Sequence, residues 1–135
     1  MNPPETIKDT PEKLMPTRAI RGATVAAANS ETAILAAARQ LLEQLAAANA
    51  LDPLHLISIF FTMTSDLNAA FPTRAARELG WSHVPLLDAQ QPAVKGDLER
   101  CLRVMIHCQT ERSVTEIKHV YLGEAKRLRP DLADK

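Results

Sequence analysis

Apolar residues recur every three or four positions in some segments of the chain, as in a helix, and every second position in others, as in a strand. From residue 31 to residue 49 the apolar side chains recur every three or four positions, at Ile34, Leu35, Ala38, Leu41, Leu42 and Leu45. This spacing forms one apolar stripe and predicts an amphipathic helix. The Asn-Ser pair at 29–30 offers N-cap side chains, and Glu31 lies in the first turn, where the helix dipole favours an anion. The Asp-Pro pair at 52–53 cannot continue the helix, which is therefore expected to end near residue 49.

Extended periods indicate the strands. Residues 98–110 alternate, with Leu102, Val104, Ile106 and Cys108 on one face and Cys101, Arg103, Met105, His107 and Gln109 on the other. Residues 18–25 are partly β-branched, and residues 56–64 are rich in β-forming side chains, so both are expected to be strands. A further short strand is expected at 84–88, and a final strand or strand pair at 119–128.

Two shorter helical segments complete the predicted elements. Phe71-Pro72 opens a short helix that ends at Gly80, because proline suits the first helical position and glycine the position after the last. Residues 114–118 are expected to form a helical turn. One long helix over a mixed β-sheet gives an α/β, or α+β layer, fold class. The proline-rich residues 1–17 are expected to be a flexible N-terminal extension, so the single domain spans 18–135.

Composition and charge exclude several classes of protein. The 135 residues suit one domain, and 16 lysines and arginines balance 16 aspartates and glutamates. A balanced charge argues against a nucleic-acid partner and against attachment to a membrane surface. No apolar run reaches the ~18 residues of a membrane span, and the N-terminal stretch lacks the apolar centre of a secretory signal. We therefore expect a globular, cytoplasmic protein.

The motifs of familiar catalytic chemistry do not occur in this sequence. It contains no glycine-rich phosphate loop, no CxxC, no GxSxG and no HExxH. The four histidines show no metal-ligand spacing. Cys101 and Cys108 would lie on opposite faces of one strand, which argues against a shared metal or a disulfide. Acid–base, nucleophilic and metal catalysis are therefore poorly supported, and no metal is expected.

Arginines are the main chemical signal. Two arginines lie within apolar stretches, Arg21 and Arg103, and two share one face of the short helix, Arg74 and Arg77. The last apolar stretch ends with Arg127 and Arg129. An arginine within a strand usually lies on the solvated face. If several converge instead, they form a site for a small polyanion, because guanidinium groups bind carboxylates bidentately and do not deprotonate.

Five sequence blocks resemble the AroH class of chorismate mutases. They are IRGAT, FPTRAARELGW, VPLL, CLRVMIH, and HVYL followed by LRPDL, in the family's order and near its spacing over residues 18–133. The resemblance implies a homotrimer of small α/β subunits that forms a pseudo-α/β barrel with active sites at subunit interfaces. It also implies conversion of chorismate to prephenate by an intramolecular Claisen-type rearrangement without a cofactor, a step in aromatic amino-acid biosynthesis. Such a reaction needs the compact substrate conformer held and the developing charge stabilised.

The resemblance further implies roles for individual residues. Arg103 would donate to the ether oxygen as negative charge grows there, whereas Arg21 and Tyr121 would hold a substrate carboxylate. The neighbouring subunit would close the site with Phe71, Thr73, Arg74 and Arg77. The wall of the site would be lined by Leu86, Leu87 and Asp88, and Arg129 in the C-terminal tail would help to cover the site.

Two positions depart from the family pattern. Gln91 stands where a glutamate usually binds the ring hydroxyl of the substrate, and no glutamate lies within that segment. An amide can still accept a hydrogen bond, but it lacks the charge that strengthens one. Asp88 stands where a cysteine or small residue is usual, and its carboxylate would repel a dianion unless it turns away or pairs with an arginine.

These departures leave three functions open. The first is a chorismate mutase, and the second is an enzyme that acts on a chorismate-related compound. The third is a non-catalytic trimer that binds a small dicarboxylate or a partner protein. A bicyclic transition-state mimic separates the mutase from the binder, because a binder has no reason to prefer that shape.

Overall fold

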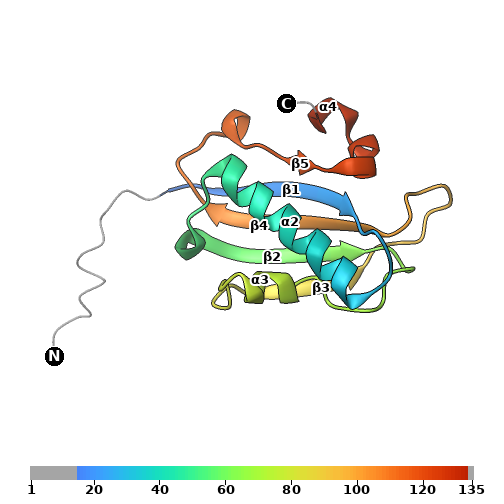
Figure 1. Ribbon diagram of the computed structural model, residues 1–135. Helices are drawn as coiled ribbons and strands as arrows, with labels where there is room; N and C mark the ends of the chain where they lie inside the picture. Colours follow the sequence, from blue (N-terminus) through green and yellow to red (C-terminus); the bar gives the residue numbers. More distant parts are fainter. Residues whose placement is uncertain (1–14, 134–135) are drawn as a thin grey trace.

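A computed structural model describes residues 15–133 and shows one five-stranded sheet with a long helix across one face (Figure 1). The strand order is β3-β2-β4-β1-β5. Strand β4 pairs antiparallel with β1 and β2, whereas β5 joins β1 and β3 joins β2 in parallel. The strands are β1 (Thr17–Val25), β2 (Leu56–Met63), β3 (Leu86–Gln90), β4 (Cys101–Gln109) and β5 (Val120–Tyr121). The predicted mixed sheet under one long helix is confirmed.

Helix α2 (Glu31–Asn49) forms where the apolar stripe predicts it. The Ser30 hydroxyl accepts a hydrogen bond from the Ala33 amide and caps the first turn. At the other end Ala50 adopts a left-handed conformation, with φ of 50°, that closes the helix. The stripe packs on the sheet and contributes Ile34, Ala38, Leu41, Leu42 and Leu45 to the buried core.

Gly22 lets α2 approach the centre of β1. A Cβ atom at this position would lie 2.9 Å from Leu45 Cδ1, 3.0 Å from the Val120 carbonyl oxygen and 3.1 Å from Leu41 Cδ1. These distances leave no room for a side chain, so the glycine of IRGAT is needed for helix–sheet packing. Because side chains alternate along a strand, Arg21 and Ala23 then point to the other face of the sheet.

The segment after residue 119 is where the predicted elements differ most from the structure. The expected final strand exists but is much shorter than 119–128, because β5 pairs with β1 only at Val120–Tyr121. Gly123 takes a φ of 55°, which turns the chain out of the sheet. Short turns follow at η3 (Gly123–Leu128) and α4 (Pro130–Ala133).

The remaining elements lie close to their predicted positions. Helix α3 (Arg74–Glu78) occupies the centre of the expected 71–80 helix, and β3 starts two residues later than expected. The short helices η1 (Pro53–His55) and η2 (Val114–Glu116) form turns before β2 and β5. Cys101 and Cys108 are both buried and unbridged.

The expected N-terminal extension lies mostly outside the described residues. Residues 1–14 are not described, and β1 already begins at Thr17, the last residue of that expected extension. Within residues 15–133, none of the helices combines the length and apolar character that crossing a membrane requires.

Candidate active site

The strand register places three polar side chains in one row on the face of the sheet that α2 does not cover. Ala23 of β1 pairs with Arg103 of β4 and with Tyr121 of β5, and Arg103 pairs with Thr62 of β2. Directly paired residues point to the same face of a sheet. Arg103 therefore lies near the centre of this open face, with Tyr121 two strands away on one side and Thr62 on the other.

This open face holds a cavity of about 560 Å³. Its polar wall includes Arg21, Arg103, Tyr121 and Arg129, and its apolar wall includes Phe60 and Leu128. Three guanidinium groups and one phenol thus surround a partly apolar space, and the lining contains no carboxylate among residues 15–133. A cavity of this size and charge suits a small, partly apolar molecule with more than one carboxylate.

Arg103 has unmatched hydrogen-bonding capacity. Its Nη2 atom lies 3.7 Å from Oδ2 of Asp97, and 44% of its side chain is exposed. Its Nε atom is buried and has no hydrogen-bond partner within the described part of the chain. A buried donor without a partner carries a desolvation cost of about 1–3 kcal/mol, which is typical of a functional site rather than of a structural contact.

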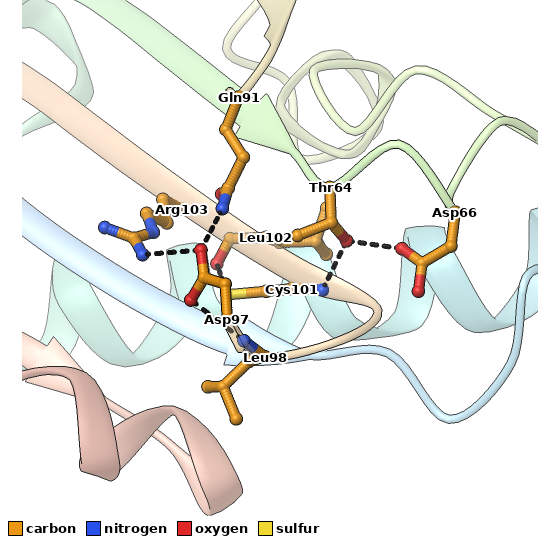
Figure 2. Close-up of polar contacts among 8 residues, drawn as sticks. All are labelled: Thr64, Asp66, Gln91, Asp97, Leu98, Cys101, Leu102 and Arg103. Atoms are coloured by element: carbon orange, nitrogen blue, oxygen red, sulfur yellow. Dashed lines mark hydrogen bonds and ion pairs between the residues drawn. The ribbon is translucent and has the colours of Figure 1, made fainter. Parts of the chain in front are cut away.

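The sequence did not reveal Asp97, which connects Gln91 to Arg103 (Figure 2). Gln91 is 8% exposed, and its Nε2 atom donates to Oδ2 of Asp97 over 2.8 Å. A second cavity, of about 410 Å³, is lined by Gln91, Asp97, Thr62 and Arg103 among others, so Thr62 and Arg103 border both cavities. The signal available in the sequence was an acidic residue in the loop that leads from Gln91 to the strand of Arg103.

His119 fixes the backbone beside Arg21. The Arg21 amide donates to Nδ1 of His119 over 3.0 Å. Since a backbone N–H can only donate, Nδ1 must be unprotonated and Nε2 carries the hydrogen. Burial lowers the pKa of His119, and the nearby Arg21 and Arg129 guanidinium groups lower it further. The imidazole is therefore held neutral beside the cationic wall of the cavity.

This contact predicts a pH-dependent loss of stability. The folded-state pKa of His119 lies below its ordinary value of 6.5, so the hydrogen bond contributes fully above that value. Its contribution is lost as the pH falls through the lowered pKa. His119→Asn supplies an acceptor that does not titrate, so its thermal midpoint should fall less than the parent's on acidification. A profile as steep as the parent's, measured by circular dichroism, would contradict this role.

Tyr121 and Arg129 reach the cavity from the C-terminal segment. Tyr121 is 8% exposed and packs with Ala23 and Ala125. Arg129 forms a bidentate pair with Asp131, in which Nη2 lies 2.7 Å from Oδ2 and Nε lies 3.0 Å from Oδ1. Arg129 must exchange this partner before it can bind a ligand carboxylate with the same atoms.

Asp88 does not face the cavity. Its Oδ2 accepts from the Thr73 hydroxyl over 2.6 Å, and its Oδ1 accepts from the Thr73 amide over 3.1 Å. Neighbouring residues on β3 point to opposite faces, and Asp88 points toward the start of α3. The Asp88 carboxylate therefore turns away from the cavity, where it would repel an anionic ligand. Its hydrogen-bond partner is Thr73 and not an arginine.

The other predicted site residues do not reach this cavity within one chain. Arg74 pairs with Glu31 and Glu78 at 3.2 and 3.3 Å, and Arg77 is exposed on the same short helix. Phe71 and Leu87 are 68% and 57% exposed. Leu86 and the buried Thr73 complete the group. Among the described residues, none of this group lines the cavity that holds Arg21 and Arg103.

Comparison with known proteins shows which family shares this sequence. The family model for chorismate mutase type I matches residues 17–132. The chain is 42% identical over 117 residues to chorismate mutase AroH of Bacillus subtilis. The aligned residues make up 86% of this chain and 92% of that protein. The chain is 43% identical over 116 residues to chorismate mutase AroH of Thermus thermophilus, with 85% and 95% covered.

A solved structure shares the fold as well as the sequence. It is a chorismate mutase from Clostridium thermocellum, with a TM-score of 0.80 and 45% sequence identity, and the similarity covers 82% of this chain and 98% of that one. The family match spans all five strands and α2, including the residues of the cationic cavity. This chain therefore belongs to the chorismate mutase type I family.

Proposed function

We propose that this protein converts chorismate to prephenate by an intramolecular Claisen-type rearrangement. The observation that carries the proposal is the convergence of Arg21, Arg103, Tyr121 and Arg129 on one cavity in a chain of this family. Chorismate carries two carboxylates on a compact, partly apolar ring, which matches the chemistry of that cavity. The rearrangement transfers no proton to the protein and forms no covalent intermediate, so it needs neither a cofactor nor an acid–base pair.

Arg103 is the catalytic residue in this proposal. As the ether C–O bond breaks, negative charge grows on its oxygen, and a donor placed there stabilises the transition state more than the ground state. The Nε atom of Arg103 is buried and has no other partner in the described residues, so a hydrogen bond to the ether oxygen would satisfy it. A guanidinium also stays charged throughout the reaction.

Arg21, Tyr121 and Arg129 bind the carboxylates of the substrate. Arg21 contributes charge from β1, Tyr121 contributes its hydroxyl from β5, and Arg129 covers the site after it exchanges Asp131. Holding both carboxylates favours the compact conformer in which the two reacting carbons approach each other. Such orientation can supply several kcal/mol of the barrier reduction, up to about 7–11 in well-oriented systems.

The active unit is a homotrimer, and the neighbouring subunit closes each site. Three exposed residues in and next to α3 do not line the cavity of their own chain: Phe71, Arg74 and Arg77. Residues that complete the site of a neighbouring subunit would be placed in this way. The Thr73 hydroxyl already donates a hydrogen bond to Asp88, so Thr73 contributes to the shape of that segment. Leu87 offers an exposed apolar wall, which Leu86 supports from the other face of β3. The protein acts in the cytoplasm.

The test is to incubate the purified chain with chorismate and to identify the product. We expect chorismate to disappear and prephenate to accumulate without any added cofactor. Turnover of isochorismate or an amino-substituted analogue in preference to chorismate would show a different reaction. Binding of a dicarboxylate without turnover would show a non-catalytic protein.

A further inference from the structure

Asp97 is held in place between two residues of the site. It follows Gly96, whose φ of 87° turns the loop that leads into β4. Its Oδ1 accepts from the Leu98 amide over 2.8 Å, and its Oδ2 accepts from Gln91 Nε2 over 2.8 Å. The same Oδ2 lies 3.7 Å from Nη2 of Arg103, and only 23% of the side chain is exposed (Figure 2). The carboxylate therefore has defined contacts on both oxygens.

The charge of Asp97 determines which way the Gln91 amide faces. An ionised carboxylate only accepts hydrogen bonds, so Gln91 must turn its NH₂ group toward Asp97. Oε1 of Gln91 then points elsewhere, and this buried acceptor has no hydrogen-bond partner in residues 15–133. A ligand hydroxyl that donates is its chemical complement. A neutral side chain at position 97 would permit the opposite orientation, with a donor in place of that acceptor.

Asp97 also restrains Arg103. An ion pair at 3.7 Å holds the Nη2 end of the guanidinium toward the loop. Because the guanidinium is planar, fixing one end limits the directions in which its Nε can donate. Arg103 borders both cavities, so its orientation decides which of them receives its hydrogen bonds.

We propose that Asp97 is a positioning residue that orients Gln91 as an acceptor and Arg103 as a donor. Together Gln91 and Asp97 provide one acceptor and one negative charge on two side chains. This inference rests on the proposed function, in which Gln91 receives the ring hydroxyl of chorismate and Arg103 the ether oxygen. It changes what Gln91→Glu should do, because a glutamate at 91 would meet a second carboxylate at hydrogen-bond distance.

The test is a reciprocal exchange of the amide and the carboxylate. Asp97→Ala and Gln91→Glu should each lower kcat/KM for chorismate by on the order of 10²-fold, because misplaced catalytic groups lose transition-state contacts. The double variant Gln91→Glu/Asp97→Asn restores one carboxylate and one amide with the hydrogen bond reversed. It should recover part of the lost activity, because position 91 again offers an acceptor, whereas the carboxylate that pairs with Arg103 is absent. Glu99→Gln, an exposed neutralisation in the same loop, is the matched control and should leave kcat/KM unchanged.

A second readout separates this inference from the proposed function. In the free protein the Nε–H signal of Arg103, assigned by its loss in Arg103→Lys, can be followed by heteronuclear NMR. We expect slow exchange with water in the parent and faster exchange in Asp97→Ala, which lacks the carboxylate that pairs with Arg103. This result does not depend on turnover, so a parent without mutase activity would overturn the proposed function and leave the positioning of Arg103 measurable.

Several results would overturn the inference. One is Asp97→Ala with parental kcat/KM and an unchanged Arg103 signal. Another is a gain of activity in Gln91→Glu alone, which would show that Asp97 does not oppose a glutamate there. A double variant no better than the single variants would show that the two residues do not act as a pair. Thermal midpoints of all variants are measured, because a general loss of folding would lower them together.

Discussion

Arg103→Ala should lower kcat for chorismate conversion by on the order of 10²-fold or more while the protein stays folded. The reason is that Arg103 lies centrally on the open face of the sheet and keeps a buried Nε donor without a partner in the described residues. In the proposed function, its removal takes away the donor that would stabilise charge on the ether oxygen. Because that charge exists mainly in the transition state, kcat should fall more than KM rises. Steady-state kinetics with a thermal midpoint measured alongside checks the result.

Two control variants sharpen this prediction. Arg103→Lys keeps the positive charge but loses the planar donor group, so it should recover only part of the lost activity. Arg39→Ala removes an exposed arginine from α2, where its partner is Glu43, and should leave kcat unchanged. Undiminished turnover in Arg103→Ala would remove Arg103 from the catalytic role.

The second large effect is complementation between inactive variants. If Arg103 of one subunit and Arg77 of its neighbour build each site, Arg103→Ala and Arg77→Ala should both be inactive alone. The two variants are unfolded together and refolded in equal amounts, so that trimers assemble at random. Each subunit at an interface is then either variant with equal chance, and about one quarter of the interfaces combine an intact Arg103 with an intact Arg77. Activity should therefore return to about one quarter of the parent's, as judged by initial rates at matched protein concentration.

The separately refolded variants, mixed only afterwards, are the control for this experiment. Without exchange of subunits they should stay inactive. If co-refolding restores no activity although size-exclusion chromatography shows mixed trimers, Arg77 does not serve the site of a neighbour. A protein that elutes as a monomer and still converts chorismate would contradict the shared site altogether.

Elements with a strong local signal could be predicted from the sequence. The period of the apolar stripe and the Ser30 cap predict α2 within its observed bounds. The alternation along β4 predicts which residues are buried, and Leu102, Val104 and Ile106 lie in the core as expected. These elements follow local rules because one face of each must meet the same core.

Features that depend on the meeting of distant segments could not be predicted. The 119–128 segment is apolar enough for a strand, but Gly123 turns it out of the sheet after two paired residues. The sequence leaves open whether Asp88 turns away from substrate or pairs with an arginine, and its Thr73 partner comes from a segment that packs beside it after folding. Asp97 carries no motif, and only the loop geometry places it against Gln91 and Arg103.

The central claim is that arginine side chains around one cavity favour the rearrangement of chorismate. Its most direct test follows the loss of chorismate with the purified parent chain and with Arg103→Ala, and identifies the product by chromatography and mass spectrometry. We expect prephenate from the parent, and from the variant only a small fraction of that rate. Chorismate left unchanged by the folded parent chain, or consumed equally well without the Arg103 guanidinium, would contradict the claim.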